Sequence, residues 1–103
     1  MIKATILYGQ PTDVEAFEKY YAETHHPLVL KAPGIIKLEY TKFLPTPDGT
    51  APAYYRMAEL YFDGPAEMQQ TMASPEGKAM GIDLANFATG GITIIVGIVE
   101  TKI

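Results

Sequence analysis

The sequence contains no cysteine, which excludes disulfide bonds, zinc–thiolate centres, iron–sulfur clusters and a cysteine nucleophile. It also lacks a long apolar run: residues 92–99 fall far short of the roughly 18 residues of a membrane span. The N-terminus has no signal-like hydrophobic region with a small-residue cleavage site. We therefore expect a cytoplasmic protein with no membrane partner.

A basic surface is missing as well. Eight basic and twelve acidic residues give a net charge of -4, and no Lys/Arg cluster forms a stripe. Nucleic-acid binding depends largely on positive charge, so we expect no nucleic-acid partner. A chain of 103 residues has room for one core, and residues 1–103 are predicted to form a single domain.

What the chain does contain is an ordered series of strand and helix signals. Alternating or continuous apolar residues indicate strands at 2–8, 35–43, 53–62 and 92–100. Apolar spacings of three and four indicate a helix from residue 14 into the two histidines, and proline-containing helix starts follow Asp63 and Ser74. The order β-α-β-β-α-β predicts an α+β, ferredoxin-like fold: an antiparallel four-stranded sheet with helices on one face.

The later strands are apolar on both faces. Ile94 and Val96 alternate with Ile95 and Val99, and the strand at 53–62 shows the same feature. Helices in so short a chain cover one face only, and monomers rarely expose a large apolar patch. We expect a homodimer through the sheet face. The alternative is a monomer with one unusually apolar strand.

Both histidines stand in the stretch YYAETHHPL, residues 20–28. Pro27 lacks the amide that a continuing helix needs, so the helix is predicted to kink or stop there. His25 follows Tyr21 by four residues and falls on the inward stripe, whereas His26 points about 100° away and is interpreted as structural or surface. An inward imidazole can act as a general base, or it can simply pack and bond a backbone carbonyl. The spacing leaves both readings open.

Two longer stretches carry a family resemblance. YYAETHHPLVLKAPGIIKLEYTKF contains an aromatic pair, His25, a proline-leucine, a Pro-Gly turn and Tyr40, and MASPEGKAMGIDLANFA contains Ser-Pro-Glu-Gly followed by Asp83 and Phe87. Together they resemble the EthD family of the dimeric α+β-barrel superfamily. With the flanking strands, the similarity extends over nearly the whole chain.

The resemblance implies a protomer that dimerises through its sheets into a dimeric α+β barrel, with a ligand cavity between helices and sheet. The family takes its name from a protein associated with ethyl tert-butyl ether degradation. Relatives in the superfamily include cofactor-independent monooxygenases, muconolactone isomerases, polyketide cyclases and haem-dependent enzymes. The fold thus indicates where a reaction would take place, but it does not specify which reaction.

On this basis we expect a cofactor-independent enzyme of catabolism or secondary metabolism that acts on a hydrophobic aromatic, lactone or ether-derived molecule. His25 is the expected acid/base, and Tyr40 and Tyr54 are expected to hold a developing oxyanion. The expected ligand-binding residues are Phe17, Tyr21, Leu28, Met68, Met72, Met80, Leu84 and Phe87. A non-catalytic binding protein for an apolar metabolite and a haem-binding protein are the alternatives.

No metal and no other cofactor is predicted. Adjacent histidines on a helix point apart, and no H-x-x-x-H spacing, phosphate loop or dinucleotide fingerprint is present. Asp83 is interpreted as a solvated or capping carboxylate. Arg56 and Glu59 are expected on opposite faces of their strand, pairing at the dimer interface with residues such as Lys37 or Glu39.

Overall fold

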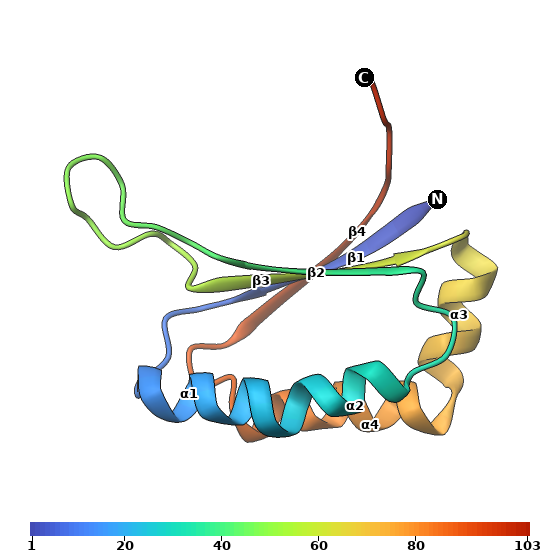
Figure 1. Cartoon of the computed structure of the whole chain (residues 1–103), viewed down its shortest axis with the longest axis horizontal. Helices are drawn as coiled ribbons and strands as arrows, with labels where there is room; N and C mark the ends of the chain where they lie inside the picture. The colour runs from blue at the N-terminus through green and yellow to red at the C-terminus, as the bar shows by residue number, and fades with distance from the viewer.

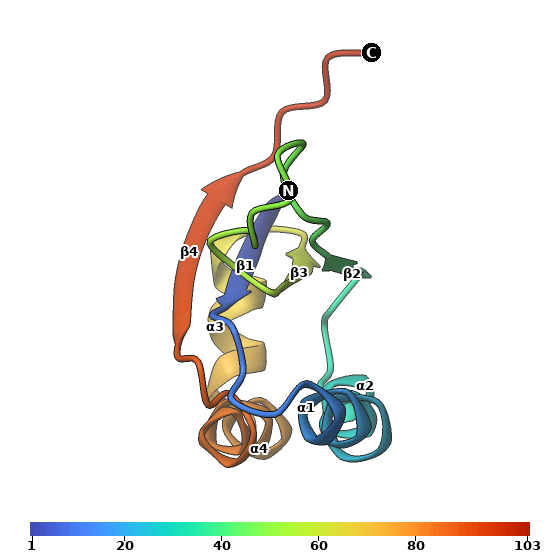
Figure 2. The ribbon, with the colours of Figure 1, turned by 90° about the vertical axis from the view of Figure 1, so that its left-hand side faces the viewer.

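A computed structural model describes all 103 residues of the chain. Four antiparallel strands form one sheet in the order β2-β3-β1-β4: β1 (Ile2–Tyr8), β2 (Lys37–Lys42), β3 (Arg56–Phe62) and β4 (Ile92–Ile98). The helices all lie on one side of this sheet (Figures 1 and 2). The fold is the predicted α+β, ferredoxin-like one.

Alternation along the central strand β1 decides which side chains face the helices. Ile2, Ala4, Ile6 and Tyr8 point to that side and are buried. On β3, Ala58 pairs with Ile6 and is buried in the same layer. The small side chains of Ala4 and Ala58 take up little space in the middle of the sheet, which helps to make room for a cavity.

The first helix does not stop at the histidines. α1 (Val14–Tyr20) starts at the N-cap Asp13 and continues through a π-helical turn, η1 (Tyr21–His25), into α2 (His26–Lys31). Pro27 lies in the first turn of α2, where the wider π turn in front of it avoids the clash that a proline ring makes in a regular helix. Pro27 therefore does interrupt the regular α-helix, as predicted, but the helix continues through a π turn.

This π turn also decides which residues face inward. Phe17, Tyr21, His25 and Val29 are all buried, at steps of four residues. In a regular α-helix each such step drifts by about 40° around the axis, and the wider turn takes up part of the drift. Val29 therefore faces the core where Leu28 was expected.

The second helical segment is split in two. α3 (Pro65–Ala73) and α4 (Pro75–Asp83) meet at Ser74, whose hydroxyl accepts a hydrogen bond from the Gly77 amide at 3.0 Å. A 3-10 turn, η2 (Leu84–Asn86), follows α4. None of the helices combines the length and apolar character needed to cross a membrane.

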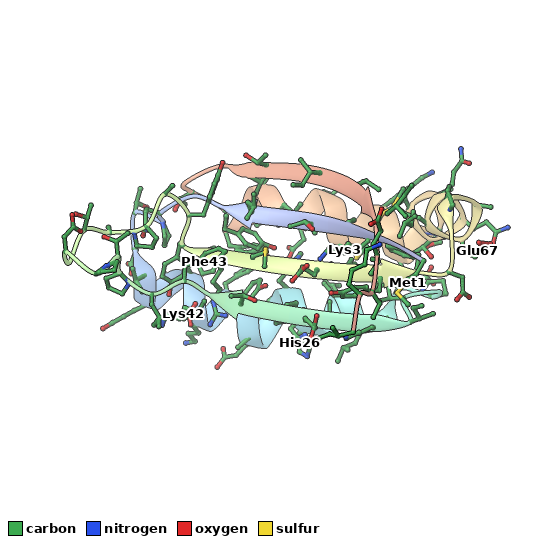
Figure 3. The ribbon with its side chains drawn as sticks, turned by 90° about the horizontal axis from the view of Figure 1, so that it is seen from above. Met1, Lys3, His26, Lys42, Phe43 and Glu67 are labelled. Carbon is green, nitrogen blue, oxygen red and sulfur yellow. The ribbon has the colours of Figure 1, made fainter.

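The sheet face opposite the helices is open, and Figure 3 looks down on it, with Lys3 projecting from β1. Lys3 pairs there with Glu59, while Tyr61 donates a hydrogen bond to Glu39 at 2.9 Å. Ile95 of β4 is 55% exposed on this face. Ile95 is the one large apolar side chain of β4 on the open face, between Thr93 and Gly97, so the predicted two-sided apolar character holds only in part, and β3 presents a mixed polar and apolar surface.

Candidate functional site

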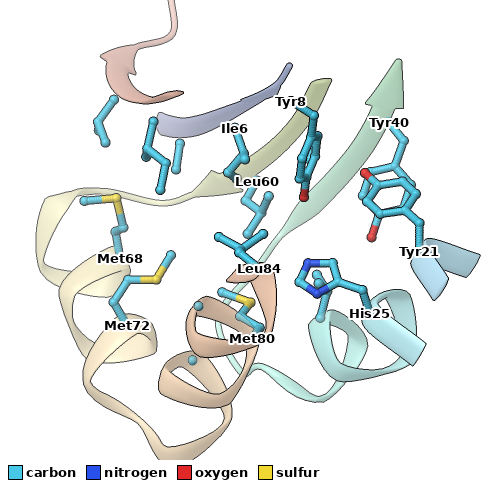
Figure 4. A pocket seen from close by; sticks show the side chains of 17 residues that line it. Ile6, Tyr8, Tyr21, His25, Tyr40, Leu60, Met68, Met72, Met80 and Leu84 are labelled. Carbon is cyan, nitrogen blue, oxygen red and sulfur yellow. The ribbon is translucent and has the colours of Figure 1, made fainter. Parts of the chain in front are cut away.

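A cavity of about 210 Å³ lies between the sheet and the helices (Figure 4). Seventeen residues line it and 14 of them are hydrophobic, so the space suits an apolar molecule. The sheet contributes Ala4, Ile6, Tyr8, Tyr40, Ala58, Leu60, Ile94 and Val96, and the helical segments contribute Tyr21, His25, Val29, Met68, Met72, Gly77, Met80, Gly81 and Leu84.

The few polar groups of the cavity gather at one end. Figure 4 shows Tyr8, Tyr21 and Tyr40 close to His25, whereas Met68 lies at the opposite end. A molecule in this space meets hydroxyl and imidazole groups on one side and only hydrocarbon and thioether groups on the other. Such an arrangement orients a ligand that has one polar end.

His25 is held by a buried carboxylate. Its Nδ1 lies 2.8 Å from Oδ2 of Asp83, and the two residues are only 4% and 6% exposed. Oδ1 of Asp83 accepts hydrogen bonds from the Tyr20 hydroxyl at 2.5 Å and from the Asn86 side-chain amide at 3.0 Å. With three donors, the carboxylate is well satisfied despite its burial.

These contacts decide which nitrogen of His25 carries the proton. Burial alone would raise the pKa of Asp83, but the hydrogen bonds it accepts lower that pKa, so the carboxylate is ionised at neutral pH and can only accept. Burial lowers the pKa of His25, against the opposing effect of Asp83, and the ring is neutral. Nδ1 therefore carries the proton, and Nε2 keeps a free lone pair.

The interpretation of Asp83 as a solvated or capping carboxylate is therefore wrong. Asp83 lies 58 residues from His25 in sequence, and only the packing of α4 against the first helix joins them. One signal could have revealed it: Asp83 shares a helical stripe with Met80 and Phe87, both of which are buried. A carboxylate on an apolar stripe needs a buried partner.

Tyr21 has a hydroxyl that is buried without any hydrogen-bond partner. Leaving such a group unpaired costs about 1–3 kcal/mol. Burial raises the pKa of Tyr21 far above its ordinary value and does the same for Tyr8, so both hydroxyls stay protonated. The ring of Tyr21 lines the cavity, while its hydroxyl oxygen is buried within the protein and interacts with Tyr8.

His26 also contributes to the site, although indirectly. Its Nδ1 lies 2.8 Å from the hydroxyl of Tyr40, and burial raises the pKa of Tyr40 to about 12. Tyr40 lines the cavity, so His26 holds the ring of a lining residue from outside. This is a structural role, one of the two that the sequence indicates.

Most of the residues expected at the site do line the cavity, while their chemical roles stay predictions: His25, Tyr21, Tyr40, Met68, Met72, Met80 and Leu84. Phe17 and Phe87 do not; they pack against each other in an adjacent aromatic cluster, with ring centroids 5.2 Å apart. Leu28 is half-buried at the margin of the core, beside Lys31, because of the shifted helix register.

Tyr54 is the expected catalytic residue that lies outside the cavity. It is 36% exposed, whereas the neighbouring Tyr55 is buried and packs on Phe17 with ring centroids 5.3 Å apart. Side-chain alternation holds only within a strand, and β3 begins at Arg56, so counting back to Tyr54 fails. The tyrosine missed by the sequence reasoning is Tyr8, which alternation places on the same face as Ile6.

Arg56 and Glu59 lie on opposite faces as expected, but their partners differ. Arg56 donates two hydrogen bonds to Glu18 of α1, at 2.8 and 2.7 Å, and its guanidinium lies 5.2 Å from the ring centroid of Tyr21. Glu59 pairs with Lys3. Arg56 therefore ties the first helix to the sheet next to Tyr21, away from the open face.

The chain has no group of three or more His, Cys, Asp or Glu side chains that could hold a metal ion. An engineered cavity of about 150 Å³ holds benzene, so the enclosed space of about 210 Å³ has room for one substituted ring.

Comparison with known proteins gives a family and a fold. The EthD domain model matches residues 9–91. An uncharacterised 11.0 kDa protein from the thcB-thcC intergenic region of Rhodococcus erythropolis is 41% identical over 95 residues, 92% of this chain and 91% of that protein. An ethyl tert-butyl ether d (EthD) family protein of Bacillus halodurans C-125 superposes with a TM-score of 0.90 at 38% identity, over 97% of this chain and 99% of that one.

More distant structures share the fold alone. A hydroxynitrile lyase from Passiflora edulis has a TM-score of 0.74 at 14% identity, over 99% of this chain and 96% of that one. A dimeric ferredoxin-like protein of unknown function from Thermobifida fusca YX has a TM-score of 0.73 at 13% identity, over 95% and 90%. The fold thus occurs in both an enzyme and a dimer.

Proposed function

The chain belongs to the EthD family, and from this premise we propose that it is a small enzyme that moves a proton on an apolar, oxygen-bearing molecule. The observation that carries the proposal is the buried His25–Asp83 pair beside an apolar cavity. In this proposal the side chains of the chain itself supply the chemistry, as in the cofactor-independent relatives of the superfamily.

His25 acts as the general base. Its Nε2 takes a proton from an activated C–H or O–H group of the substrate, and the imidazolium that forms is stabilised by the Asp83 carboxylate 2.8 Å away. The same nitrogen can return the proton at another atom of the substrate, which gives an isomerisation. Elimination, cyclisation and oxygenation begin with the same proton removal.

Tyr21 stabilises the negative charge that this step leaves on a substrate oxygen. Its hydroxyl is protonated and makes no short hydrogen bond in the protein, so we expect it to turn from Tyr8 to a substrate oxygen. A preorganised donor of this kind is worth about 10²–10³ in rate where it has been removed from other enzymes. We assign Tyr40, which lines the cavity and is held by His26, to orient the same oxygen.

The size of the cavity favours a substrate with a single ring or a branched group of similar bulk. The Passiflora edulis hydroxynitrile lyase supports the view that this fold accommodates catalysis without fixing the reaction of this chain. A role in ethyl tert-butyl ether degradation or other catabolism stays a prediction from the family name. The cytoplasmic location also stays a prediction.

Proton exchange tests the shared first step without knowledge of the natural substrate. Acetophenone, a single-ring methyl ketone, is incubated with the protein in D₂O, and loss of its methyl signal is followed by ¹H NMR. We expect the wild-type protein to accelerate exchange, His25→Gln to lose about 10²–10⁴ of that acceleration, and Tyr21→Phe to lose about 10²–10³.

Tyr54→Phe is the matched control for Tyr21→Phe, because Tyr54 lies outside the cavity and should leave exchange unchanged. Equal exchange by wild type and His25→Gln would refute the assignment of the base. Binding of acetophenone without any exchange by the wild type would favour the alternative, a binding protein for an apolar metabolite.

We further propose that two copies associate through the open sheet face. β4 exposes Ile95 there, and dimers occur among proteins of this fold. Ile95→Arg would place a charge in the interface and should yield a monomer in light scattering. Ile82→Arg, at a 74% exposed position of α4, should not change the mass. A wild-type monomer at micromolar concentration would contradict the proposal.

A further inference from the structure

One stripe of α4 and of the turn η2 that follows it borders the cavity and contains two glycines. Gly77, Met80, Gly81 and Leu84 follow each other at spacings of three, one and three residues, and all four line the cavity. Glycine is among the poorest helix formers, so each glycine in a helix interior calls for a reason.

Gly77 has a packing reason, and Gly81 has none. A Cβ atom at Gly77 would lie 2.0 Å from the carbonyl oxygen of Thr71, so only glycine fits where α4 passes α3. A Cβ atom at Gly81 would meet nothing within 4 Å. The space that the missing side chain leaves at Gly81 belongs to the border of the cavity.

The cavity is also open on the side of β4. Ile94 and Val96 line it, yet they are 53% and 52% exposed. Ile92 and Ile98 follow on the same face of this strand, and their side chains are exposed too, so an apolar track continues beyond the cavity. In Figure 4 the pale red strand, β4, lies at the end occupied by Met68, away from His25.

From this geometry we propose that the substrate is longer than the cavity. Its oxygen-bearing head lies at His25, and an apolar tail leaves between Gly81 and the strand β4. The substrate class is thus a single-ring or similar polar head with a flexible alkyl or alkenyl chain. This inference rests on the proposed function for the position of the head, and Gly81 determines which tails can pass.

Binding of 4-alkylphenols tests the proposal. Dissociation constants of phenol, 4-ethylphenol, 4-butylphenol and 4-hexylphenol are measured by titration calorimetry. With the wild-type protein we expect affinity to rise by about fourfold for each methylene that is buried, and then to level off without a loss. With Gly81→Leu we expect 4-hexylphenol to bind about 10- to 200-fold more weakly, while phenol binds as before.

Ala85→Leu introduces the same leucine side chain at an exposed position that does not line the cavity, and serves as the control. Gly81→Ala is the milder variant should Gly81→Leu fold poorly, and it should weaken only the longest chains. Three results would overturn the proposal: loss of affinity beyond ethyl in the wild type, unchanged 4-hexylphenol binding in both Gly81 variants, or no binding of any phenol. The proposed proton transfer fails separately, through unchanged exchange in His25→Gln.

Discussion

Replacing Asp83 by asparagine should switch the proton of His25 from Nδ1 to Nε2. Asparagine has the shape of aspartate but only one accepting oxygen, and Tyr20 and Asn86 both donate to Oδ1. The amide nitrogen then takes the place of Oδ2, 2.8 Å from Nδ1 of His25. Two donors cannot face each other, so Nδ1 must give up its proton and accept instead.

The switch removes the lone pair that the proposed base uses. In a protease with a comparable Asp–His pair, the same substitution leaves the geometry intact and lowers the rate by about 10⁴ through the wrong tautomer, so we expect acetophenone exchange to fall by a similar factor. Stability should fall as well. Hydrogen bonds to a charged acceptor contribute about 1.5–3 kcal/mol to stability, and those to a neutral acceptor contribute about 0.5–1.5 kcal/mol. The substitution also removes a buried charge, which offsets part of the difference. We therefore expect the free energy of unfolding to fall by roughly 1–3 kcal/mol.

Long-range ¹H–¹⁵N NMR of the imidazole nitrogens reads the tautomer directly. The chain has only two histidines, so His26→Gln leaves the signals of His25 alone. We expect a protonated Nδ1 in the wild type and a protonated Nε2 in Asp83→Asn. Asp63→Asn, at an exposed carboxylate, makes the same chemical change and should leave the tautomer as it is. An unchanged tautomer in Asp83→Asn would refute the reasoning.

Alanine substitutions at the two glycines of α4 should change stability in opposite directions. Gly81→Ala should raise the free energy of unfolding by about 1 kcal/mol. Gly77→Ala should lower it by roughly 1–3 kcal/mol, because the new Cβ would lie 2.0 Å from a backbone oxygen. Urea unfolding of both variants checks this, and shifts of the same sign would contradict it. Stability should also fall as the pH drops below 6.5, because the unfolded chain protonates His25 while the folded protein keeps the ring neutral to lower pH. Below pH 3.8 the lowered pKa of Asp83 adds a further loss. Urea unfolding from pH 7.5 to 5 should show the first slope in wild type and not in His25→Gln, and a flat wild-type profile would contradict the buried neutral ring.

The elements of this fold could be predicted from the sequence because their signals are local. Alternation over residues 2–8 places β1 at its observed bounds, and the Ser-Pro start at residues 74–75 places the beginning of α4. A strand or helix needs only the right periodicity and the right start and end residues, all of which lie within a few positions of each other. The order of these elements then leaves few topologies.

The candidate site could likewise be predicted only where local signals apply. The inward position of His25 and most of the cavity wall followed from helical periodicity and family resemblance. The errors at Leu28 and Tyr54 arose where periodicity is interrupted, at the π turn and at the start of β3. A one-residue shift moves a side chain to another face, and local sequence signals do not locate such a shift reliably.

The sequence by itself therefore determined the strands, the helices, the single-face arrangement and a histidine that points inward. Only the tertiary structure decided that Asp83 meets His25, that Arg56 binds Glu18, and that the hydroxyl of Tyr21 has no partner. The physical reason is distance along the chain. Periodicity specifies which face a side chain occupies, but the partner on that face comes from packing between segments tens of residues apart, and this contact decides a buried group's charge and hydrogen bonds.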